Sequence, residues 1–253
     1  MKRIYFRTRG GGKQGWGNVI KLSNILELIK KKLKHLFIIE GNSHIHQYLK
    51  KKNLNCLKLP ENISLKKEEE KIKNLIKSDV TIMEMLDCSY KRQEIYKKKT
   101  KKLIVLDDIL ENKYCADLVI CAQKKSLIKK INNLKIDFDY YPIDYKFKKY
   151  LKKNKKINYK LKKIFICLGG SFYKRTFLYL FNYFKNKNFQ IIFFLGNESK
   201  KITKINLQKF KNIKVKYNLD HIAKHIYYSD LVICGGGYIK LETAFLQTPM
   251  ITI

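Results

Sequence analysis

Three glycine-rich stretches contain the residues of this sequence that are best suited to chemistry. They are RTRGGGKQGWGN at 7–18, CLGGS at 167–171 and CGGGYIKLE at 234–242. Each follows a short apolar run and precedes a stretch with helical spacing of apolar residues. A glycine turn between a strand and a helix leaves the first backbone amides of the helix unpaired, and such amides bind phosphate groups. The three stretches therefore predict sites for a phosphorylated ligand. The alternative, for any one of them, is a turn that binds nothing.

The last stretch offers the most complete set of groups. The backbone amides around Gly236, Gly237 and Tyr238 are expected to bind a diphosphate, because the helix dipole favours negative charge there. Glu242 lies five residues after Gly237, about one helical turn into the helix. Its carboxylate could accept two hydrogen bonds from a ribose diol. The sequence therefore predicts nucleotide binding at this turn.

The first stretch also fits a dinucleotide fingerprint. Residues 10–15, GGGKQG, match G-x-G-x-x-G between a strand and a helix, and Glu40 ends the next strand, where a ribose ligand would stand. Glycine density alone can satisfy such a pattern. Trp16 and Gly17 also continue the loop where the third glycine should already lie inside the helix. An NAD-dependent enzyme is therefore kept as a lesser alternative.

The sequence predicts strands that alternate with helices along the chain, and the glycine turns lie between them. Apolar runs such as RIYF, HLFIIE and KKLIVL alternate with amphipathic stretches. This pattern predicts parallel sheets covered by helices on both faces. A basic stretch without apolar periodicity interrupts the series after Tyr141. We therefore predict the α/β class, with two Rossmann-like domains at 1–145 and 161–253 that face one another across a cleft, joined by a linker at 146–160.

Two smaller features complete this organisation. The charged helix SLKKEEEKIKNLIKS, with a serine cap, is predicted to be mostly solvated surface. The final PMITI is typical of a buried strand, yet nothing follows to cover it. The second domain is therefore expected to be incomplete, as in a truncated member of a longer family.

The composition limits the class of protein. The 253 residues carry a formal net charge of +34, and 45% of them are hydrophobic. No apolar run approaches the roughly 18 residues of a membrane span. The first residues, MKRIYFRTRGGG, contain no apolar h-region and no cleavage site, so no secretory signal is expected. The six scattered cysteines form no C-x-x-C pair. A cytoplasmic protein is expected, at most peripheral to the inner membrane surface.

The basic charge is distributed rather than clustered. Only five of the 55 basic residues are arginine, and the lysines are spread along the chain. A dedicated nucleic-acid site would favour clustered arginine with aromatic platforms. The lysine excess therefore predicts weak attraction to anionic membranes or other polyanions, and no specific nucleic-acid partner.

Four stretches carry a resemblance to a known family: RTRGGGKQGWGN, LIVLDDILENKYCADLVI, CLGGS and SDLVICGGGYIKLETAFLQTPMI. Over nearly the whole chain they resemble the nucleotide-sugar hydrolases of pseudaminic-acid synthesis and the related spore-coat polysaccharide proteins. These belong to the GT-B superfamily, alongside the transferase that adds N-acetylglucosamine in peptidoglycan synthesis. The last stretch is the most specific, with its aspartate before the strand, paired glycines, glutamate five residues on, and proline before the next strand.

The resemblance implies that a UDP-sugar binds in the cleft between the domains. The glycines of the last turn would contact the diphosphate, the glutamate would hold the ribose, and the first loop would approach the sugar. The residues assigned to the substrate in this way are Gly15, Gly17, Gly170, Ser171, Gly236, Gly237, Tyr238 and Glu242. No cofactor and no metal are expected, since amides and the helix dipole would stabilise the departing UDP.

Three positions depart from the pattern of the hydrolase. The family has a histidine after G-x-G that acts as general base, whereas this chain has Asn18, whose amide cannot take a proton near neutral pH. The family has a tyrosine directly after an aspartate near the end of a first-domain strand. Here Asp87 is present, but the nearest tyrosine is Tyr90. Tyr238 stands where the family usually has serine.

We therefore predict an enzyme of surface-glycan or nonulosonic-acid synthesis, with Asn18 and Asp87 as the candidate catalytic residues. It would transfer the sugar of a UDP-sugar to a glycan or lipid-linked acceptor, or hydrolyse the sugar–UDP bond. Asn18 favours transfer, with Asp87 or Glu40 as the base for the acceptor hydroxyl. Of the consecutive Asp107 and Asp108, only one can face the cleft, and Asp108 is preferred as a structural or substrate-orienting group. The alternatives are a degenerate, non-catalytic relative and a basic nucleic-acid-binding protein.

Overall fold

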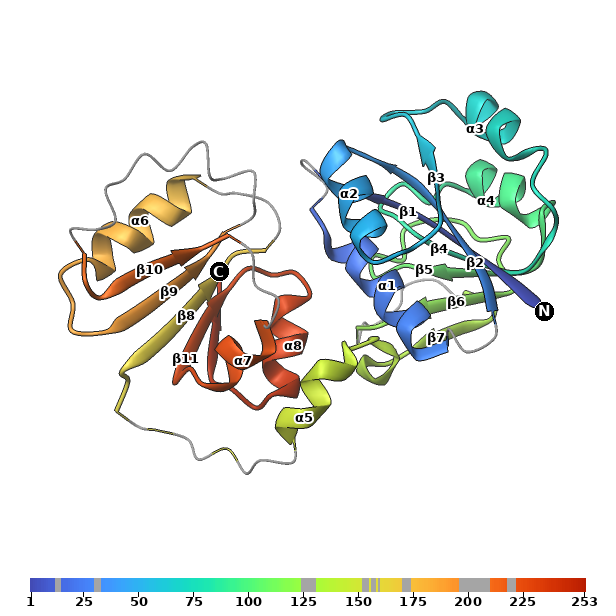
Figure 1. The fold of residues 1–253 in the computed structure, drawn as a ribbon. Helices are drawn as coiled ribbons and strands as arrows, with labels where there is room; N and C mark the ends of the chain where they lie inside the picture. The colour runs from blue at the N-terminus through green and yellow to red at the C-terminus, as the bar shows by residue number, and fades with distance from the viewer. Residues whose placement is uncertain are drawn as a thin grey trace. The chain divides into compact units, whose positions relative to one another are not determined.

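A computed structural model describes residues 1–11, 15–29, 33–123, 131–151, 155, 158, 160–169, 174–195, 210–217 and 222–253. The chain divides into two compact units, Met1–Pro142 and Ile143–Ile253. Each unit contains one parallel sheet with helices on both faces (Figure 1). Among the described residues, no helix is both long and apolar enough to span a membrane.

The first unit contains a seven-stranded sheet in the order β3-β2-β1-β4-β5-β6-β7, with every neighbouring pair parallel. Its strands are β1 (Lys2–Gly10), β2 (Leu33–Gly41), β3 (Cys56–Leu59), β4 (Ser78–Glu84), β5 (Thr100–Leu106), β6 (Leu118–Cys121) and β7 (Leu134–Ile136). The central β1 is almost wholly buried. Helices on both sides of the sheet leave its strands little exposure to water, which explains their nearly continuous apolar runs.

Two pairs of helices cover the two faces of this sheet. They are α1 (Gly17–Ile29) and α2 (Ser43–Lys51) on one face, and α3 (Leu65–Ile72) and α4 (Tyr90–Lys97) on the other. Successive residues of β1 point to opposite faces, so Phe6 packs under α1 and α2 whereas Tyr5 packs under α3 and α4. Side-chain caps begin two of the helices, Asn42 on α2 and Ser64 on α3.

The second unit repeats this plan with five parallel strands in the order β10-β9-β8-β11-β12. The strands are β8 (Lys163–Cys167), β9 (Gln190–Phe194), β10 (Ile213–Lys216), β11 (Leu231–Cys234) and β12 (Met250–Thr252). One face packs against α6 (Lys174–Phe184), and the other against α5 (Lys148–Leu151), α7 (Ile222–Tyr227) and α8 (Ile239–Phe245). Two short 3₁₀ turns, Phe138–Tyr140 and Tyr145–Phe147, lie on either side of the unit boundary.

The range 146–160, assigned above to a linker, begins with ordered structure. Residues 145–151 form a 3₁₀ turn followed by α5, and Phe147 and Tyr150 are buried in the core of the second unit. Two aromatic side chains three residues apart are enough to anchor one helical turn, even among lysines. The start of the proposed linker therefore belongs to the second unit, while residues 152–154, 156, 157 and 159 lie outside the described part of the chain.

Candidate functional site

Each sheet has one topological switch point, where ligands of open α/β sheets bind. In the first unit it lies between β1 and β4, and in the second between β8 and β11. At these places the chain leaves two adjacent strands in opposite directions, which opens a crevice at their carboxyl ends. The loops after β1 and after β11 are two of the glycine-rich stretches, so the fold places both of them at switch points.

In the second unit, the three glycines after β11 have different structural roles. A Cβ on Gly235 would lie 2.7 Å from the carbonyl oxygen of Leu168, so the close approach to the end of β8 requires glycine. A Cβ on Gly236 or Gly237 would meet no atom within 4 Å, and neither residue has a positive φ. Close packing therefore explains why position 235 holds glycine. Neither packing nor backbone conformation explains the glycines at positions 236 and 237.

The turn also presents backbone donors. Gly236 and Gly237 are exposed, and their amides make no backbone hydrogen bond within the described ranges. Tyr238 follows at the N-cap of α8, and its carbonyl accepts from the amides of Leu241 and Glu242. Open space over two free amides at a switch point is the geometry that a diphosphate requires.

Glu242 lies in the first turn of α8, half-buried beside this turn. Burial, with a smaller contribution from the Asp144 carboxylate, raises the pKa of Glu242 to about 8. The side chain makes no hydrogen bond to any residue that the structure describes. A carboxyl group without a hydrogen bond to any described residue, in the first turn of the helix that follows the glycine turn, is compatible with the predicted contact with a ribose.

The raised pKa of Glu242 predicts a pH effect on stability. Below the unfolded-state pKa, both states carry the proton; as the pH rises through about 8, the folded protein loses the stability that its tighter proton binding contributes. We expect Glu242→Gln, which mimics the protonated group, to gain thermal stability over the wild type between about pH 5 and about pH 9. Melting temperatures of both proteins across that range measure the effect. A constant difference would contradict the raised pKa, although water at the half-buried carboxyl limits the size of the change.

In the first unit, the glycine loop makes a closed turn before α1. The amide of Gly11 donates to the carbonyl of Gly15 at 2.7 Å, and both residues have positive φ values, 89° and 68°. α1 then begins at Gly17, and Asn18 is half-buried in its first turn. Asn18 therefore lies at the carboxyl end of β1, as expected, while residues 12–14 lie outside the described part of the chain.

A buried lysine ties α1 to the neighbouring strand ends. Lys21 Nζ lies 2.9 Å from a carboxylate oxygen of Glu84, at the end of β4, and 3.2 Å from one of Asp108, after β5. Burial lowers the pKa of Lys21, but these two carboxylates raise it more, so the ammonium stays charged. The triad fixes the turn that carries Asn18 over the switch point. It also gives Asp108 a structural contact.

Asp107, the neighbour of Asp108, shapes the loop after β5. Its carboxylate accepts hydrogen bonds from the amides of Ile109 and Leu110 and from the side chains of Asn112 and Tyr114. The two aspartates therefore have separate partners, in agreement with the expectation that consecutive residues point to opposite sides.

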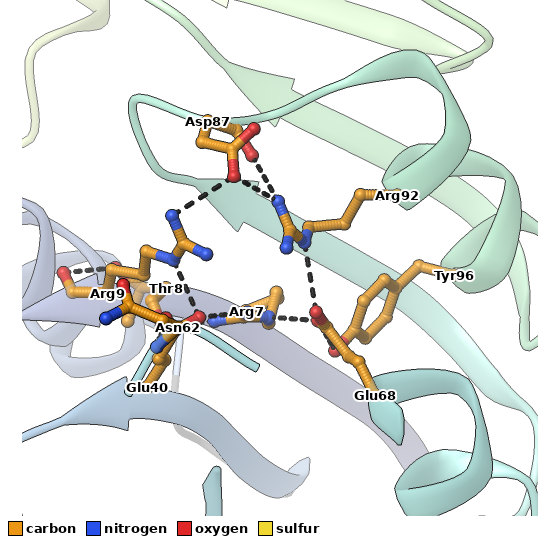
Figure 2. A network of polar contacts seen from close by, with 9 residues as sticks. All are labelled: Arg7, Thr8, Arg9, Glu40, Asn62, Glu68, Asp87, Arg92 and Tyr96. Atoms are coloured by element: carbon orange, nitrogen blue, oxygen red, sulfur yellow. Dashed lines mark hydrogen bonds and ion pairs between the residues drawn. The ribbon is translucent and has the colours of Figure 1, made fainter. Parts of the chain in front are cut away.

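Six charged side chains form a closed ring on the face of the first sheet that α3 and α4 cover (Figure 2). This ring is called here the charge ring. Arginines and carboxylates alternate around it, and each makes an ion pair with both of its neighbours. The pairs are Arg7–Glu40 (3.0 Å), Glu40–Arg9 (2.6 Å), Arg9–Asp87 (3.1 Å), Asp87–Arg92 (2.6 Å), Arg92–Glu68 (3.0 Å) and Glu68–Arg7 (2.6 Å). Five elements or loops contribute: β1, β2, α3, α4 and the loop after β4.

The interior of the charge ring is dry. Arg7 and Glu68 are fully buried, and Glu68 also accepts a hydrogen bond from the Tyr96 hydroxyl at 2.8 Å. Burial raises the pKa of Glu68, but the hydrogen bond and charge of Arg7 outweigh it, so this pKa lies below its usual range. Asp87 is the exception, with 53% of its side chain exposed. The ring therefore runs from the core to the surface, and it reaches the surface at Asp87.

The charge ring engages two residues for which the sequence suggested other roles, Glu40 and Asp87. Glu40 accepts from Arg7, Arg9 and the amide of Asn62, so both of its oxygens are engaged, and it is 4% exposed. It is therefore unavailable as the ribose ligand of an NAD site or as a base for an acceptor. Asp87 Oδ2 accepts hydrogen bonds from both Arg9 and Arg92, so this oxygen already has two charged partners.

The structure distributes the predicted site residues over both units. Gly236, Gly237, Tyr238 and Glu242 come together at the β11–α8 turn. Asn18 and Asp87 follow β1 and β4 at the switch point of the first unit, where Gly15 and Gly17 also lie. Gly170 and Ser171 fall outside the described residues. Within the described ranges, no group of three or more histidine, cysteine or acidic side chains is placed to hold a metal ion.

Sequence reasoning missed most of the charge ring. The sequence places Glu68 on a charged helix that is expected to be mostly solvated surface. One signal was present: three of the five arginines in a lysine-rich chain belong to this ring. A planar guanidinium can pair with two carboxylates in fixed directions, which a lysine ammonium does poorly.

The comparisons with known proteins identify the fold. No family model and no curated protein matches the sequence. Solved structures do match, among them MurG of Acinetobacter baumannii, with a TM-score of 0.65 and 13% identity, over 100% of this chain and 78% of that one. The chain has the GT-B fold.

Two further GT-B structures support this assignment. The UDP-N-acetylglucosamine 2-epimerase of Rickettsia bellii has a TM-score of 0.61 at 13% identity, covering 99% of this chain and 78% of that one. CalG4, the calicheamicin glycosyltransferase, has a TM-score of 0.61 at 7% identity, covering 100% and 79%. The predicted fold class is therefore confirmed. At such identities the likeness establishes the fold alone.

Proposed function

We propose that this protein binds a UDP-sugar through the β11–α8 turn and acts in the synthesis of a surface glycan. The observation that carries the proposal is the pair Gly236 and Gly237. Both border open space, and neither packing nor backbone conformation requires glycine at these two positions. Glu242 adds an unengaged carboxyl group one helical turn away. Proteins of the same fold include an enzyme named for UDP-N-acetylglucosamine and a glycosyltransferase.

Each group has a separate task in this proposal. The amides of Gly236, Gly237 and Tyr238 bind the diphosphate and stabilise the charge that develops on the departing UDP, so the reaction requires no metal. Glu242 accepts hydrogen bonds from the ribose hydroxyls. Four further residues, assigned to the substrate by resemblance alone, keep that role: Gly15, Gly17, Gly170 and Ser171.

Transfer to an acceptor is favoured over hydrolysis as the reaction. Asn18 stands where the resembling hydrolases have their basic histidine, and its amide can orient a hydroxyl but cannot accept a proton. Asp87 and Glu40, the other candidate bases, are held by arginines. A base for the transfer therefore has to come from the substrates or from a residue not yet assigned. The acceptor would be a glycan or a lipid-linked sugar.

Calorimetric titration with UDP at physiological salt tests the nucleotide site. We expect micromolar affinity in the wild type and a loss of about tenfold or more in Glu242→Ala, because two hydrogen bonds between the ribose and the Glu242 carboxyl group are removed. Glu61→Ala, at an exposed position of the first unit, is the control and should bind as the wild type does. Affinity that disappears at moderate salt would instead indicate nonspecific polyanion binding and contradict the proposal.

An activity assay on the wild-type protein distinguishes transfer from hydrolysis. UDP-N-acetylglucosamine is incubated with the chain, and UDP and free sugar are measured. Free sugar released in step with UDP would identify hydrolysis and contradict the preference for transfer. UDP release that depends on an added saccharide or lipid-linked acceptor would support transfer.

A further inference from the structure

We propose that Arg9 and Arg92 form a binding site for an oxyanion, a phosphate or a carboxylate group of a ligand, and that the Asp87 carboxylate occupies this site in the present structure. The site belongs to the first unit. The nucleotide turn belongs to the second unit, and this proposal does not rest on the proposed nucleotide site.

The first argument is the geometry of the two guanidinium groups. Asp87 Oδ2 lies between them, 3.1 Å from Arg9 Nη1 and 2.6 Å from Arg92 Nη1 (Figure 2). Each arginine is anchored from behind by its Nε, that of Arg9 on Glu40 and that of Arg92 on Glu68. The two groups are therefore held in fixed positions with their Nη atoms turned toward one acceptor, an arrangement suited to a planar or tetrahedral oxyanion.

The second argument is unused donor capacity. Arg9 and Arg92 are 9% and 4% exposed as whole residues. Within the described residues neither Nη2 has a hydrogen-bond acceptor, and neither is a fully buried unpaired atom. The Asp87 carboxylate contacts the pair through Oδ2 alone, since its Oδ1 has no partner among the same residues. The backbone carbonyl of Asp87 also accepts from Arg92 Nη1, at 2.8 Å. An oxyanion with three or four oxygens could engage donors that the aspartate leaves unused.

The third argument is charge. The charge ring contains three arginines and three carboxylates. Two of the carboxylates, Glu40 and Glu68, are buried and fixed, whereas Asp87 is half-exposed on the loop after β4. If Asp87 turns outward, the remaining five groups carry one net positive charge. A buried charge without a partner is costly, so the site without Asp87 favours an anion from solution.

The fourth argument is position. Asp87 follows β4 and Arg9 lies next to the end of β1, so the pair stands at the switch point of the first sheet. This is where the fold opens to ligands. The geometry therefore favours a carboxylate that mimics a ligand and is displaced by one.

Phosphate binding by Asp87→Asn tests this site. The variant removes the competing charge and keeps the shape of the side chain. We expect inorganic phosphate, titrated by calorimetry at physiological salt, to bind the variant about tenfold tighter than the wild type or better, since one pair of charge-assisted hydrogen bonds no longer competes. A parallel titration with acetate distinguishes a phosphate site from a carboxylate site, and tighter binding of either supports the proposal.

The control variant is Asp79→Asn. Asp79 pairs with Lys101 and accepts from the amide of Arg3 near the opposite end of β4, so its substitution changes the net charge by the same amount. It should leave phosphate and acetate affinity unchanged. Equal affinity of Asp87→Asn and the wild type for both anions would overturn the proposal, as would an equal gain in the control.

A thermal measurement keeps the test valid if Asp87→Asn is less stable. Phosphate should raise the melting temperature of this variant more than that of the wild type, because binding to the folded state alone stabilises it. Asp87→Ser serves as a second variant with the same expectation. UDP titration of both variants distinguishes this site from the nucleotide turn. We expect both variants to have the UDP affinity of the wild type and an altered phosphate affinity. If the wild type does not bind UDP, the phosphate result still tests the oxyanion site.

Discussion

Arg7→Met is expected to lower the free energy of unfolding of the first unit by about 3–5 kcal/mol, the usual cost of removing one partner from a buried ion pair. Arg7 is fully buried and contacts Glu68 at 2.6 Å and Glu40 at 3.0 Å. Without the guanidinium, the buried carboxylates Glu40 and Glu68 each lose one positively charged partner. Methionine fills most of the volume, so the loss reports charge rather than a cavity.

Urea unfolding followed by tryptophan fluorescence measures this effect. Trp16 is the single tryptophan of the chain and packs edge-on against Tyr48, so its emission reports on the first unit alone. A probe confined to one unit avoids the ambiguity of a two-unit transition. Arg175→Met, at an exposed position of α6, is the control and should leave this transition unchanged. A loss below about 1 kcal/mol in Arg7→Met would mean that Arg9 and Arg92, which already pair with Glu40 and Glu68, compensate the two carboxylates without Arg7.

Arg7→Lys sharpens the interpretation. A lysine keeps the positive charge but presents a compact ammonium group instead of a planar fork. It could approach one carboxylate well and the other poorly, so we expect a loss intermediate between the wild type and Arg7→Met. This explains in physical terms why the position holds one of only five arginines in a chain that otherwise uses lysine.

The fold was predictable because its signal is local. The apolar run HLFIIE forms part of β2, because a strand buried on both faces of a sheet consists mostly of apolar residues. The segment after the first glycine loop forms α1, as its helical spacing of apolar residues predicts. The order β3-β2-β1-β4 could be expected from the same alternation, because right-handed crossovers restrict the topology. The two glycine turns at the switch points were predicted for the same reason: they lie between a strand and a helix.

The charge ring was not predictable from local patterns because its partners are far apart in the sequence. Arg7 and Glu68 are separated by 61 residues and Arg9 and Asp87 by 78. Glu68 stands in the run LKKEEEKI, where the neighbouring charges suggested a solvated helix. Glu68 and Ile72 nevertheless face the core, and only the arrangement of α3 over β1 decides which of three consecutive glutamates is buried.

The three glycines of the β11–α8 turn allow binding and folding to be separated. Gly235→Ala should destabilise the second unit, because its Cβ would stand 2.7 Å from the Leu168 carbonyl oxygen and backbone would have to move. Gly236→Ala and Gly237→Ala should be neutral or stabilising by about 0.4–1 kcal/mol, since alanine restricts the unfolded chain at positions with open space and no positive φ. Thermal unfolding of the three variants gives this comparison.

UDP affinity should depend on the glycines that stability does not require, Gly236 and Gly237. In the double variant Gly236→Ala/Gly237→Ala, two methyl groups occupy the space in which the diphosphate would approach the amides. We expect UDP affinity to fall by about 100-fold, as the loss of one to two charge-assisted hydrogen bonds implies. A protein that is at least as stable as the wild type and no longer binds UDP would show that these glycines serve a ligand. If the double variant binds UDP as the wild type does, the diphosphate does not lie on this turn, and Glu242 loses its proposed partner as well.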